Sequence, residues 1–220
     1  MSLYEKTKRA FDVLSASALF VVTLPIQIPT AVAIAATMGR PVLFRQERAG
    51  KNGEPFKMMK FRSMHDVDPA RGRVDDASRL TGLGKFIRAT SIDELPTLVN
   101  IIRGDMSVVG PRPLYMRYLE RYNEHQARRQ EVRPGLTGLA QVSGRNGLDW
   151  EKRFDLDVYY VDHRSIPLDL KILWRTVAVV LKREGISEEG HVTMTEFMGN
   201  EPTATTTEPE AKPVVEDKKS

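Results

Sequence analysis

The chain has no cysteine among its 220 residues. Disulfide bonds, thiolate zinc sites and a cysteine nucleophile are therefore all excluded. Histidine is also scarce: its 4 copies lie at positions 65, 125, 163 and 191, without the spacing of metal ligands. We therefore interpret the histidines as ordinary surface or core residues.

A long segment near the N-terminus has almost no charge. Residues 11–38 contain no Lys, Arg or Glu, and a single Asp near one edge. This length is sufficient for a membrane helix, which needs about 20 apolar residues. Pro25 and Pro29 argue against a straight helix, because each removes a backbone donor and its ring clashes with the preceding turn. Each half is then roughly 20 Å long, which is shorter than the hydrocarbon core of about 30 Å.

Basic residues flank this apolar segment at both ends. They are Lys6, Lys8 and Arg9 before it, and Arg40, Arg45, Arg48 and Lys51 after it. Since basic flanks stay in the cytoplasm, both ends favour the same side of a membrane. We therefore predict a re-entrant helix-turn-helix over residues 1–39 that enters and leaves by the cytoplasmic face. A plain transmembrane anchor, a signal peptide and a buried core helix are the competing interpretations.

The charge balance indicates which partners suit the protein. The formal net charge is +4, and residues 201–220 hold a net −2, so the rest of the chain carries +6. A basic body suits phosphate-bearing ligands and an anionic membrane surface. No nucleic-acid motif with interleaved aromatic residues is present, so we predict no nucleic-acid partner. Residues 200–220 are rich in Thr, Glu and Pro, which predicts a disordered acidic tail.

Local patterns predict an α+β fold that is mostly helical with a short β-hairpin. The hairpin covers residues 41–64, with its turn at residues 50–53. A polar, Asp-rich loop follows over residues 66–78. The helical segments are residues 83–103, about 114–131, from about 150 onward, and 167–183. The last of these helices has an apolar stripe that suits either a core or a membrane interface, as an interfacial amphipathic helix.

Asp93 and Glu94 are the strongest candidates for chemistry. Adjacent residues on a helix point about 100° apart, so one carboxylate can bind a metal while the other meets a substrate. A structural role competes, because Ser91 and Glu94 match a capping box and acids in a first turn favour the helix dipole. Nearby basic residues and a glycine-bearing loop favour the chemical interpretation. Mg²⁺-assisted phosphoryl transfer requires such a combination of acids, cations and flexible backbone.

A second dense stretch covers residues 133–147. Its glycines allow close backbone approach to a ligand, and Gln141 and Arg145 have side chains that suit a nucleotide or a sugar. An ordinary glycine-rich connector explains the same residues equally well. From the residues alone, both interpretations remain open.

Several motifs resemble those of a known family. They are Met59-Lys-Phe-Arg-Ser-Met64, Ser91-Ile-Asp-Glu-Leu-Pro96, the loop over residues 104–113, the stretch over residues 132–142, and Tyr159-Tyr160. These segments look like those of the bacterial sugar transferase family, which comprises the monotopic phosphoglycosyl transferases. The chain is most similar to the small, single-domain PglC-like members, over about residues 4–199. The resemblance therefore implies a membrane-bound enzyme.

The resemblance also implies a reaction. A phospho-sugar passes from a UDP-sugar to a polyprenol phosphate, usually undecaprenyl phosphate, and UMP is released. This is the first membrane step of glycoconjugate assembly. By analogy with the family, Asp93 attacks the phosphorus that bears the sugar and forms a covalent intermediate. Glu94, together with Asp93, binds Mg²⁺. A non-catalytic membrane scaffold and a Mg²⁺-dependent phosphatase are the alternative functions.

The family further implies how the chain is divided and where it works. Residues 40–199 form a catalytic domain on the cytoplasmic face of the bacterial inner membrane, in contact with its lipids. A homodimer is one possible assembly. The residues that we assign to substrate binding are Lys60, Arg62, Arg88, Arg112, Gln141 and Arg145.

One departure from the family lies at the membrane bend, Thr23-Leu24-Pro25. Small family members commonly have Ser-Pro there, and the serine hydroxyl meets a freed carbonyl. Here leucine precedes the proline. We expect Thr23 to take over the role of that serine, or Gln27 and Pro29 to change the bend.

Overall fold

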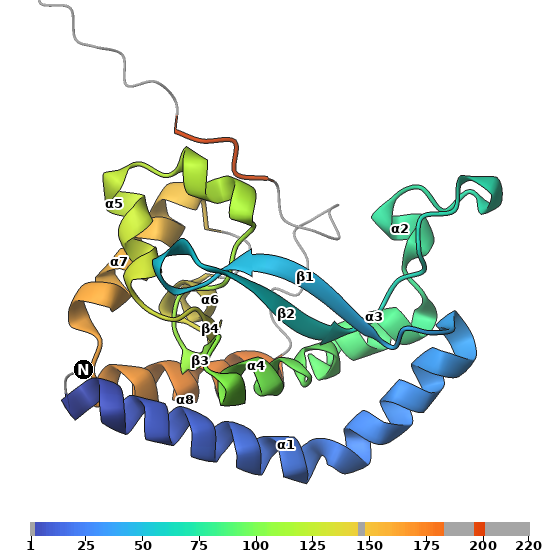
Figure 1. The fold of residues 1–220 in the computed structure, drawn as a ribbon, viewed down its shortest axis with the longest axis horizontal. Coiled ribbons are helices and arrows are strands. Elements are labelled where there is room, and N and C mark those ends of the chain that lie inside the picture. The colour runs from blue at the N-terminus through green and yellow to red at the C-terminus, as the bar shows by residue number, and fades with distance from the viewer. Residues whose placement is uncertain (1–2, 145–147, 183–195, 201–220) are drawn as a thin grey trace, which may run out of the picture.

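The computed structural model describes residues 3–144, 148–182 and 196–200. This part of the chain is mostly helical, with two short two-stranded sheets (Figure 1). The helices are α1 (Leu3–Met38), α2 (Asp76–Arg79), α3 (Gly82–Ala89), α4 (Thr97–Arg103), α5 (Glu124–Ala127), α6 (Leu139–Ser143), α7 (Trp150–His163) and α8 (Ile166–Lys182). The strands are β1 (Leu43–Ala49), β2 (Pro55–Phe61), β3 (Ser107–Val109) and β4 (Gly135–Thr137). Short 3-10 turns are η1 (Lys51–Gly53), η2 (Pro69–Arg71), η3 (Ile92–Glu94), η4 (Met116–Arg121) and η5 (Arg128–Glu131).

Helix α1 runs along one side of the protein and bends partway along its length (Figure 1). The chain stays helical through Pro25 and Pro29, so the predicted helix-turn-helix is instead one continuous bent helix. A proline inside a helix removes a hydrogen bond and kinks the axis, while packing on neighbouring elements maintains the helical path. The two prolines are four residues apart and share one face, so their kinks act in the same direction.

Polar side chains bond to carbonyl groups close to this bend. The Thr23 hydroxyl donates to the Leu19 carbonyl at 2.6 Å. The Gln27 amide donates to the Phe20 carbonyl at 3.3 Å and to the Thr23 hydroxyl at 2.9 Å. The Thr23 hydroxyl therefore meets the Leu19 carbonyl, and not the Val21 carbonyl that loses its helical donor at Pro25, so Thr23 does not take over the role of the serine in this structure.

Both halves of α1 pack on the rest of the protein through one face. In the first half, Ala16 packs against Leu98 of α4. In the second half, Ile34 packs against Phe61 of β2 and Ile87 of α3. The exposed face is apolar and includes Leu14, Leu19, Val21, Val22, Ile26, Ile28 and Val32. By length and composition, α1 is the one helix in the described residues that is able to cross a membrane.

Two charged residues fix the first half of α1 in place. Asp12 is buried, and its carboxylate accepts the Val108 backbone N–H at 3.0 Å. Arg9 donates to the carbonyls of Ile101 and Ile102, at 2.7 and 2.8 Å. These carbonyls lie at the end of α4, where carbonyl groups lack intrahelical partners. The single Asp of the apolar segment therefore joins α1 to β3.

The predicted hairpin is confirmed. Strands β1 and β2 are antiparallel, and Leu43 pairs with Phe61 at the open end. At the turn, Asn52 and Gly53 have φ angles of 57° and 77°. Asn and Gly are the residues that adopt this left-handed conformation most easily, so the turn forms where the sequence predicts it.

The predicted helix over residues 83–103 is wrong in its continuity. The chain instead forms α3, the 3-10 turn η3 and α4. Ser91 adopts a left-handed conformation, with φ 57°, which interrupts the helical path before η3. The predicted helix over residues 114–131 likewise divides into η4, α5 and η5, because the backbone of Tyr122 and Asn123 is extended.

The parallel pair β3–β4 was not predicted. Ser107 pairs with Gly135 and Val109 pairs with Thr137. Each strand has three residues and lies in a stretch rich in Gly and Pro, which sequence patterns assign to loops. The pairing brings the two glycine-bearing stretches of the chain together.

Helices α7 and α8 complete the fold. The predicted start of a helix near residue 150 is confirmed, and Asp149 caps it, since its carboxylate accepts the Lys152 backbone N–H at 2.8 Å. On α8, Ile172 is buried, whereas Leu170, Trp174 and Val177 are exposed. The stripe on α8 therefore faces outward, as an interfacial helix requires.

Candidate active site

Asp93 and Glu94 lie in the 3-10 turn η3, between α3 and α4. Ser91 precedes them in the left-handed conformation, and its side chain makes no capping hydrogen bond. The competing interpretation of Ser91 and Glu94 as a capping box is therefore wrong. Glu94 directs its carboxylate toward β2 instead of back along its own turn.

Two cations surround the Glu94 carboxylate. Lys60 Nζ lies 2.6 Å from Glu94 Oε1, and Arg112 Nη2 lies 3.8 Å from the same oxygen. Burial by itself would raise the pKa of Glu94, but the charges of Lys60 and Arg112 outweigh it and lower that pKa to about 2. Glu94 is therefore ionised throughout the physiological pH range.

Asp93 has the opposite environment. Its side chain is buried, with only 8 % of the residue exposed, and it has no hydrogen-bond partner in the described part of the chain. Burial and the adjacent charge of Glu94 raise the pKa of Asp93 to about 6, against the opposing charges of Lys60, Arg88 and Arg112. A poorly solvated carboxylate without hydrogen bonds is well suited to act as a nucleophile. Two neighbouring carboxyls with divergent pKa values also indicate different roles.

Helix α4 holds β2, and with it Lys60, against the Asp93–Glu94 dyad. The Thr97 hydroxyl donates to the Met59 carbonyl at 2.8 Å. Asn100 accepts the Met59 N–H at 3.0 Å and donates to the Lys57 carbonyl at 2.9 Å. Both side chains are fully buried, and sequence reasoning missed them. The sequence does contain a signal for them: they are two polar residues, three positions apart, on an otherwise apolar helical face.

Close backbone packing holds the loop that carries Arg112. The Gly110 N–H donates to the Thr137 carbonyl at 2.9 Å, and the Gly135 N–H donates to the Pro111 carbonyl at 2.8 Å. A Cβ on Gly135 would lie 2.1 Å from the Gly110 nitrogen, so no larger residue fits there. The glycine-rich stretch therefore acts as a connector. It also supports the loop that places Arg112 beside Glu94.

The structure brings some of the predicted substrate-binding residues to the carboxylates. Lys60 and Arg112 contact Glu94 directly, and Arg88 on α3 lies near enough to favour the charged forms of both carboxyls. Arg145 lies outside the described residues.

Arg62 and Gln141 are engaged elsewhere. The Arg62 guanidinium is buried and donates to the carbonyls of Met38 and Pro41. The Gln141 amide nitrogen donates to the Leu136 carbonyl at 3.1 Å. In this structure Arg62 thus holds the end of α1 and Gln141 braces a turn, and neither contacts the dyad.

The dyad is the candidate metal site. In the described residues, no three His, Asp or Glu side chains group as metal ligands. Mg²⁺ commonly binds one or two carboxylates and completes its shell with water and substrate phosphates. Glu94 is ionised and uses only Oε1 for its cationic contacts. These residues therefore fit a Mg²⁺ ion that is shared with a phosphate-bearing ligand.

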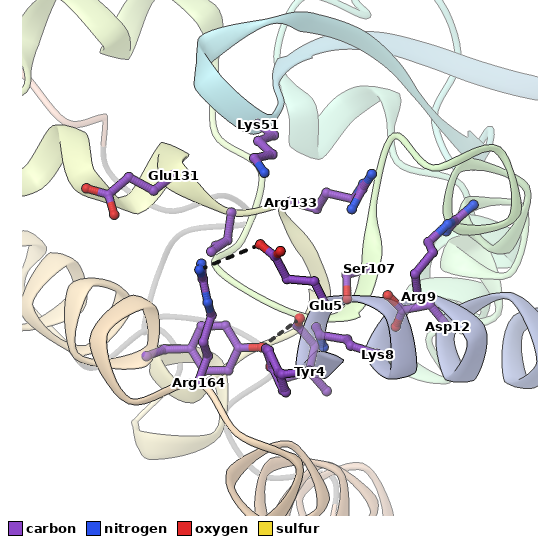
Figure 2. A pocket seen from close by; sticks show the side chains of 13 residues that line it. Tyr4, Glu5, Lys8, Arg9, Asp12, Lys51, Ser107, Glu131, Arg133 and Arg164 are labelled. Atoms are coloured by element: carbon purple, nitrogen blue, oxygen red, sulfur yellow. Dashed lines mark hydrogen bonds and ion pairs between the residues drawn. The ribbon is translucent and has the colours of Figure 1, made fainter. Parts of the chain in front are cut away.

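A small cavity of about 50 Å³ lies away from the dyad. Figure 2 shows Tyr4 and Lys8 of α1, Ser107 of β3 and Arg133 around it. Neither Asp93 nor Glu94 lines this cavity. We therefore locate the site from its titratable groups and not from the cavity.

Comparisons with known proteins point to one family. The profile of the bacterial sugar transferase family matches residues 3–183. The chain is 50 % identical to the uncharacterized sugar transferase EpsL of Bacillus subtilis over 88 % of this chain and 96 % of that protein. It is 43 % identical to the UDP-glucose:undecaprenyl-phosphate glucose-1-phosphate transferase of Caulobacter vibrioides, over 79 % of this chain and 69 % of that protein.

Other relatives are longer than this chain. The undecaprenyl-phosphate galactose phosphotransferase of Salmonella typhimurium is 38 % identical over 81 % of this chain, but over only 41 % of its own length. The chain therefore matches nearly all of a small relative and less than half of a large one. The shared part contains the dyad and the Arg112 loop.

Proposed function

The chain belongs to the bacterial sugar transferase family, and we propose that it transfers a phospho-sugar from a UDP-sugar to undecaprenyl phosphate, with release of UMP. The observation that carries this proposal is the dyad, in which a buried Asp93 with a raised pKa lies beside a Glu94 that is held ionised by two cations. The names of the relatives support the same substrate classes.

In the proposed first step, Asp93 attacks the phosphorus that bears the sugar. A bond forms between a carboxylate oxygen of Asp93 and that phosphorus, and the bond from the phosphorus to the bridging oxygen breaks. UMP leaves with the bridging oxygen and its electron pair. The product is a phospho-sugar attached to Asp93 as an acyl phosphate. Because burial leaves the Asp93 carboxylate poorly solvated, little water has to be displaced before its attack.

In the second step, the polyprenol phosphate attacks the same phosphorus. An oxygen of the lipid phosphate forms the new bond, and the Asp93 carboxylate leaves. The lipid diphospho-sugar departs and free Asp93 is regenerated. Two steps allow a soluble donor and a lipid acceptor to use one site in turn.

The cations of the site would neutralise the charge of the diphosphate. Lys60 and Arg112 lie beside Glu94, and Arg88 is close to both carboxyls. Bound Mg²⁺, held by Glu94 with Asp93 beside it, would supply electrostatic stabilisation to the phosphate oxygens. Lys60 and Arg112 then orient the donor so that its phosphorus faces Asp93.

We propose that α1 is re-entrant and that the protein is monotopic, on the cytoplasmic face of the inner membrane. The packing of α1 supports this topology. Its first half contacts α4, and its second half contacts β2 and α3. A helix that crosses a bilayer places its ends on opposite sides, about 30 Å apart, where one small domain has no access to both. The exposed apolar faces of α1 and α8 would lie in the lipid.

The absence of native cysteine makes this topology easy to test by labelling. We expect Lys6→Cys and Arg45→Cys to react equally with a membrane-impermeant thiol reagent in inverted vesicles, and neither in right-side-out vesicles. Both residues are exposed; Lys6 lies in the first turns of α1, before its apolar stretch, and Arg45 follows the helix in β1. Cysteine-free wild type is the control. Labelling of the two positions from opposite sides would contradict re-entry and establish a span.

The reaction itself is tested by UMP release from a panel of UDP-sugars with Mg²⁺, detergent and undecaprenyl phosphate. We expect one donor to give sustained UMP turnover only when the lipid is present, with the labelled sugar recovered in the organic phase. Without lipid, UMP release should stop at about one equivalent per enzyme, because the Asp93 intermediate then has no acceptor. Water-soluble sugar phosphate formed without lipid would indicate a phosphatase. No UMP from any donor, with the protein folded and membrane-bound, would favour a scaffold.

The pH dependence of the reaction should report Asp93. Attack requires the ionised carboxylate, so kcat/KM should fall as the pH drops below about 6, the raised pKa of Asp93. The cations beside Glu94 lower its pKa, so it stays ionised down to about pH 2. Glu94 therefore does not contribute to the fall in kcat/KM at acid pH, the acid limb of the profile. The measurement is kcat/KM for the donor from pH 4 to pH 8 at constant ionic strength. An acid limb centred near pH 4 would contradict the assignment.

A further inference from the structure

Arg112 meets the dyad through a single long contact. Its Nη2 lies 3.8 Å from Glu94 Oε1, and its side chain is 45 % exposed. Such a contact is too weak to fix a long side chain. The position of the guanidinium therefore depends mainly on the backbone that carries it, residues 109–112.

Arg129 holds one end of this backbone. Its Nη2 donates to the Arg112 carbonyl at 2.6 Å. The same guanidinium is paired with Asp157 of α7, with Nη2 and Nε lying 2.8 and 3.0 Å from Asp157 Oδ2. Arg129 and Asp157 are each only 2 % exposed. A buried ion pair gains little net stability, because desolvation offsets the attraction. The pair has a second consequence, because it fixes the guanidinium that donates to the Arg112 carbonyl.

Tyr160 lies at the other end of the same segment. Its hydroxyl is 3.1 Å from the Val109 carbonyl and 2.8 Å from the Asp169 carboxylate. Tyr160 follows Asp157 by three positions on α7, so both project from one face of that helix. Helix α7 therefore supports both ends of residues 109–112, and the glycine contacts of β4 support the middle.

We propose that Arg129 is a positioning residue, which acts through the Arg112 carbonyl to hold the Arg112 guanidinium beside the dyad, with Tyr160 supporting the other end of the segment. The inference rests on the proposed function, because the task of Arg112 there is to bind the donor diphosphate. Arg129 itself touches no substrate. Its effect should therefore depend on the presence of the Arg112 side chain.

The test is a double-mutant cycle of Arg129→Lys with Arg112→Ala. Lysine keeps the charge but lacks the planar fork that meets Asp157 and the Arg112 carbonyl together. We expect kcat/KM for the UDP-sugar to fall about tenfold with Arg129→Lys, since small misplacements of a positioning group are costly. In the Arg112→Ala background, the same substitution should cause no further loss.

The neighbouring exposed Arg128 supplies a matched control, because it pairs with Asp162 away from the Arg112 loop. Arg128→Lys should leave kcat/KM unchanged. If Arg129→Lys does not fold, Tyr160→Phe takes its place in the cycle, with Tyr159→Phe as its control. Tyr159 is half exposed and stacks on His163. Equal losses in both Arg112 backgrounds, or wild-type kinetics, would overturn the inference.

UDP binding, measured by calorimetry, separates this inference from the proposed function. If the wild type released no UMP from any donor, the proposed function would fail. A loss of UDP affinity in Arg129→Lys that vanishes in the Arg112→Ala background would still support the positioning role. Unchanged UDP affinity in both backgrounds, alongside unchanged kinetics, would overturn it.

Discussion

Asp93→Asn is expected to lower UMP release by about a thousandfold or more, because the amide has no nucleophilic oxygen with which to form the acyl phosphate. Asparagine has nearly the same size and shape as aspartate. Asp93 also has no hydrogen bond in the described structure that the substitution would disturb. The fold and the affinity for UDP should therefore survive, and the loss should appear in kcat.

The same substitution should stabilise the protein at pH 7. The pKa of Asp93 is raised from 3.8 to about 6 by burial and by Glu94, so the folded state holds its proton more tightly than the unfolded chain does. Stability therefore falls as the pH rises from about 3.8 to about 6, by an upper bound of about 3 kcal/mol, and the full loss is present at pH 7. Asparagine carries no charge and avoids this penalty. We expect a higher melting temperature for Asp93→Asn at pH 7, and a smaller difference below pH 5.

This pair of effects distinguishes catalysis from structure. A capping or packing role for Asp93 would make Asp93→Asn less stable as well as less active. Asp155→Asn is a matched control, because Asp155 is an exposed aspartate on α7 that pairs with His125. It should change neither activity nor melting temperature. An active Asp93→Asn variant would remove Asp93 from the mechanism.

Glu94→Gln should lower kcat by about a hundredfold, because the site loses the charge that holds Lys60 and Arg112 and the proposed ionised ligand for Mg²⁺. The activity that remains in this variant should also differ in its pH dependence. The charge of Glu94 helps to raise the pKa of Asp93, so its removal should move the acid limb of kcat/KM below pH 6.

The measurement is the pH profile of Glu94→Gln beside the wild type, at several Mg²⁺ concentrations. Glu131→Gln serves as the control, since Glu131 is exposed and pairs with Arg128. Wild-type turnover with an unchanged requirement for Mg²⁺ would contradict the role of Glu94. An acid limb that stays near pH 6 would show that the two carboxyls do not interact as their geometry indicates.

Local sequence signals predicted the elements that depend on local physics. The turn of the hairpin follows from Asn52 and Gly53, and the start of α7 follows from Asp149. The apolar N-terminal segment and its prolines predicted a bent helix, although the structure maintains it as one helix. The Asp-Glu dyad was visible because adjacent acids near a glycine-bearing loop and several cations are a rare combination.

The remaining features depend on contacts between distant parts of the chain. The left-handed Ser91 breaks a segment whose apolar spacing reads as one helix, and local propensity does not reveal such a break. Strands β3 and β4 exist only because two glycine-bearing stretches pack against each other. The engagement of Arg62 with the end of α1 depends on how that helix docks, which the sequence around Lys60 does not reveal.

The central claim is that Asp93 receives the phospho-sugar before the lipid does. The most direct measurement is intact-protein mass spectrometry after reaction with the preferred UDP-sugar and Mg²⁺, without lipid. We predict that the wild type gains the mass of one phospho-sugar, that Asp93→Asn gains none, and that undecaprenyl phosphate removes the adduct as the lipid diphospho-sugar forms. An unmodified wild type that still releases UMP when the lipid is added would contradict the account, because the sugar phosphate would then pass directly from donor to lipid.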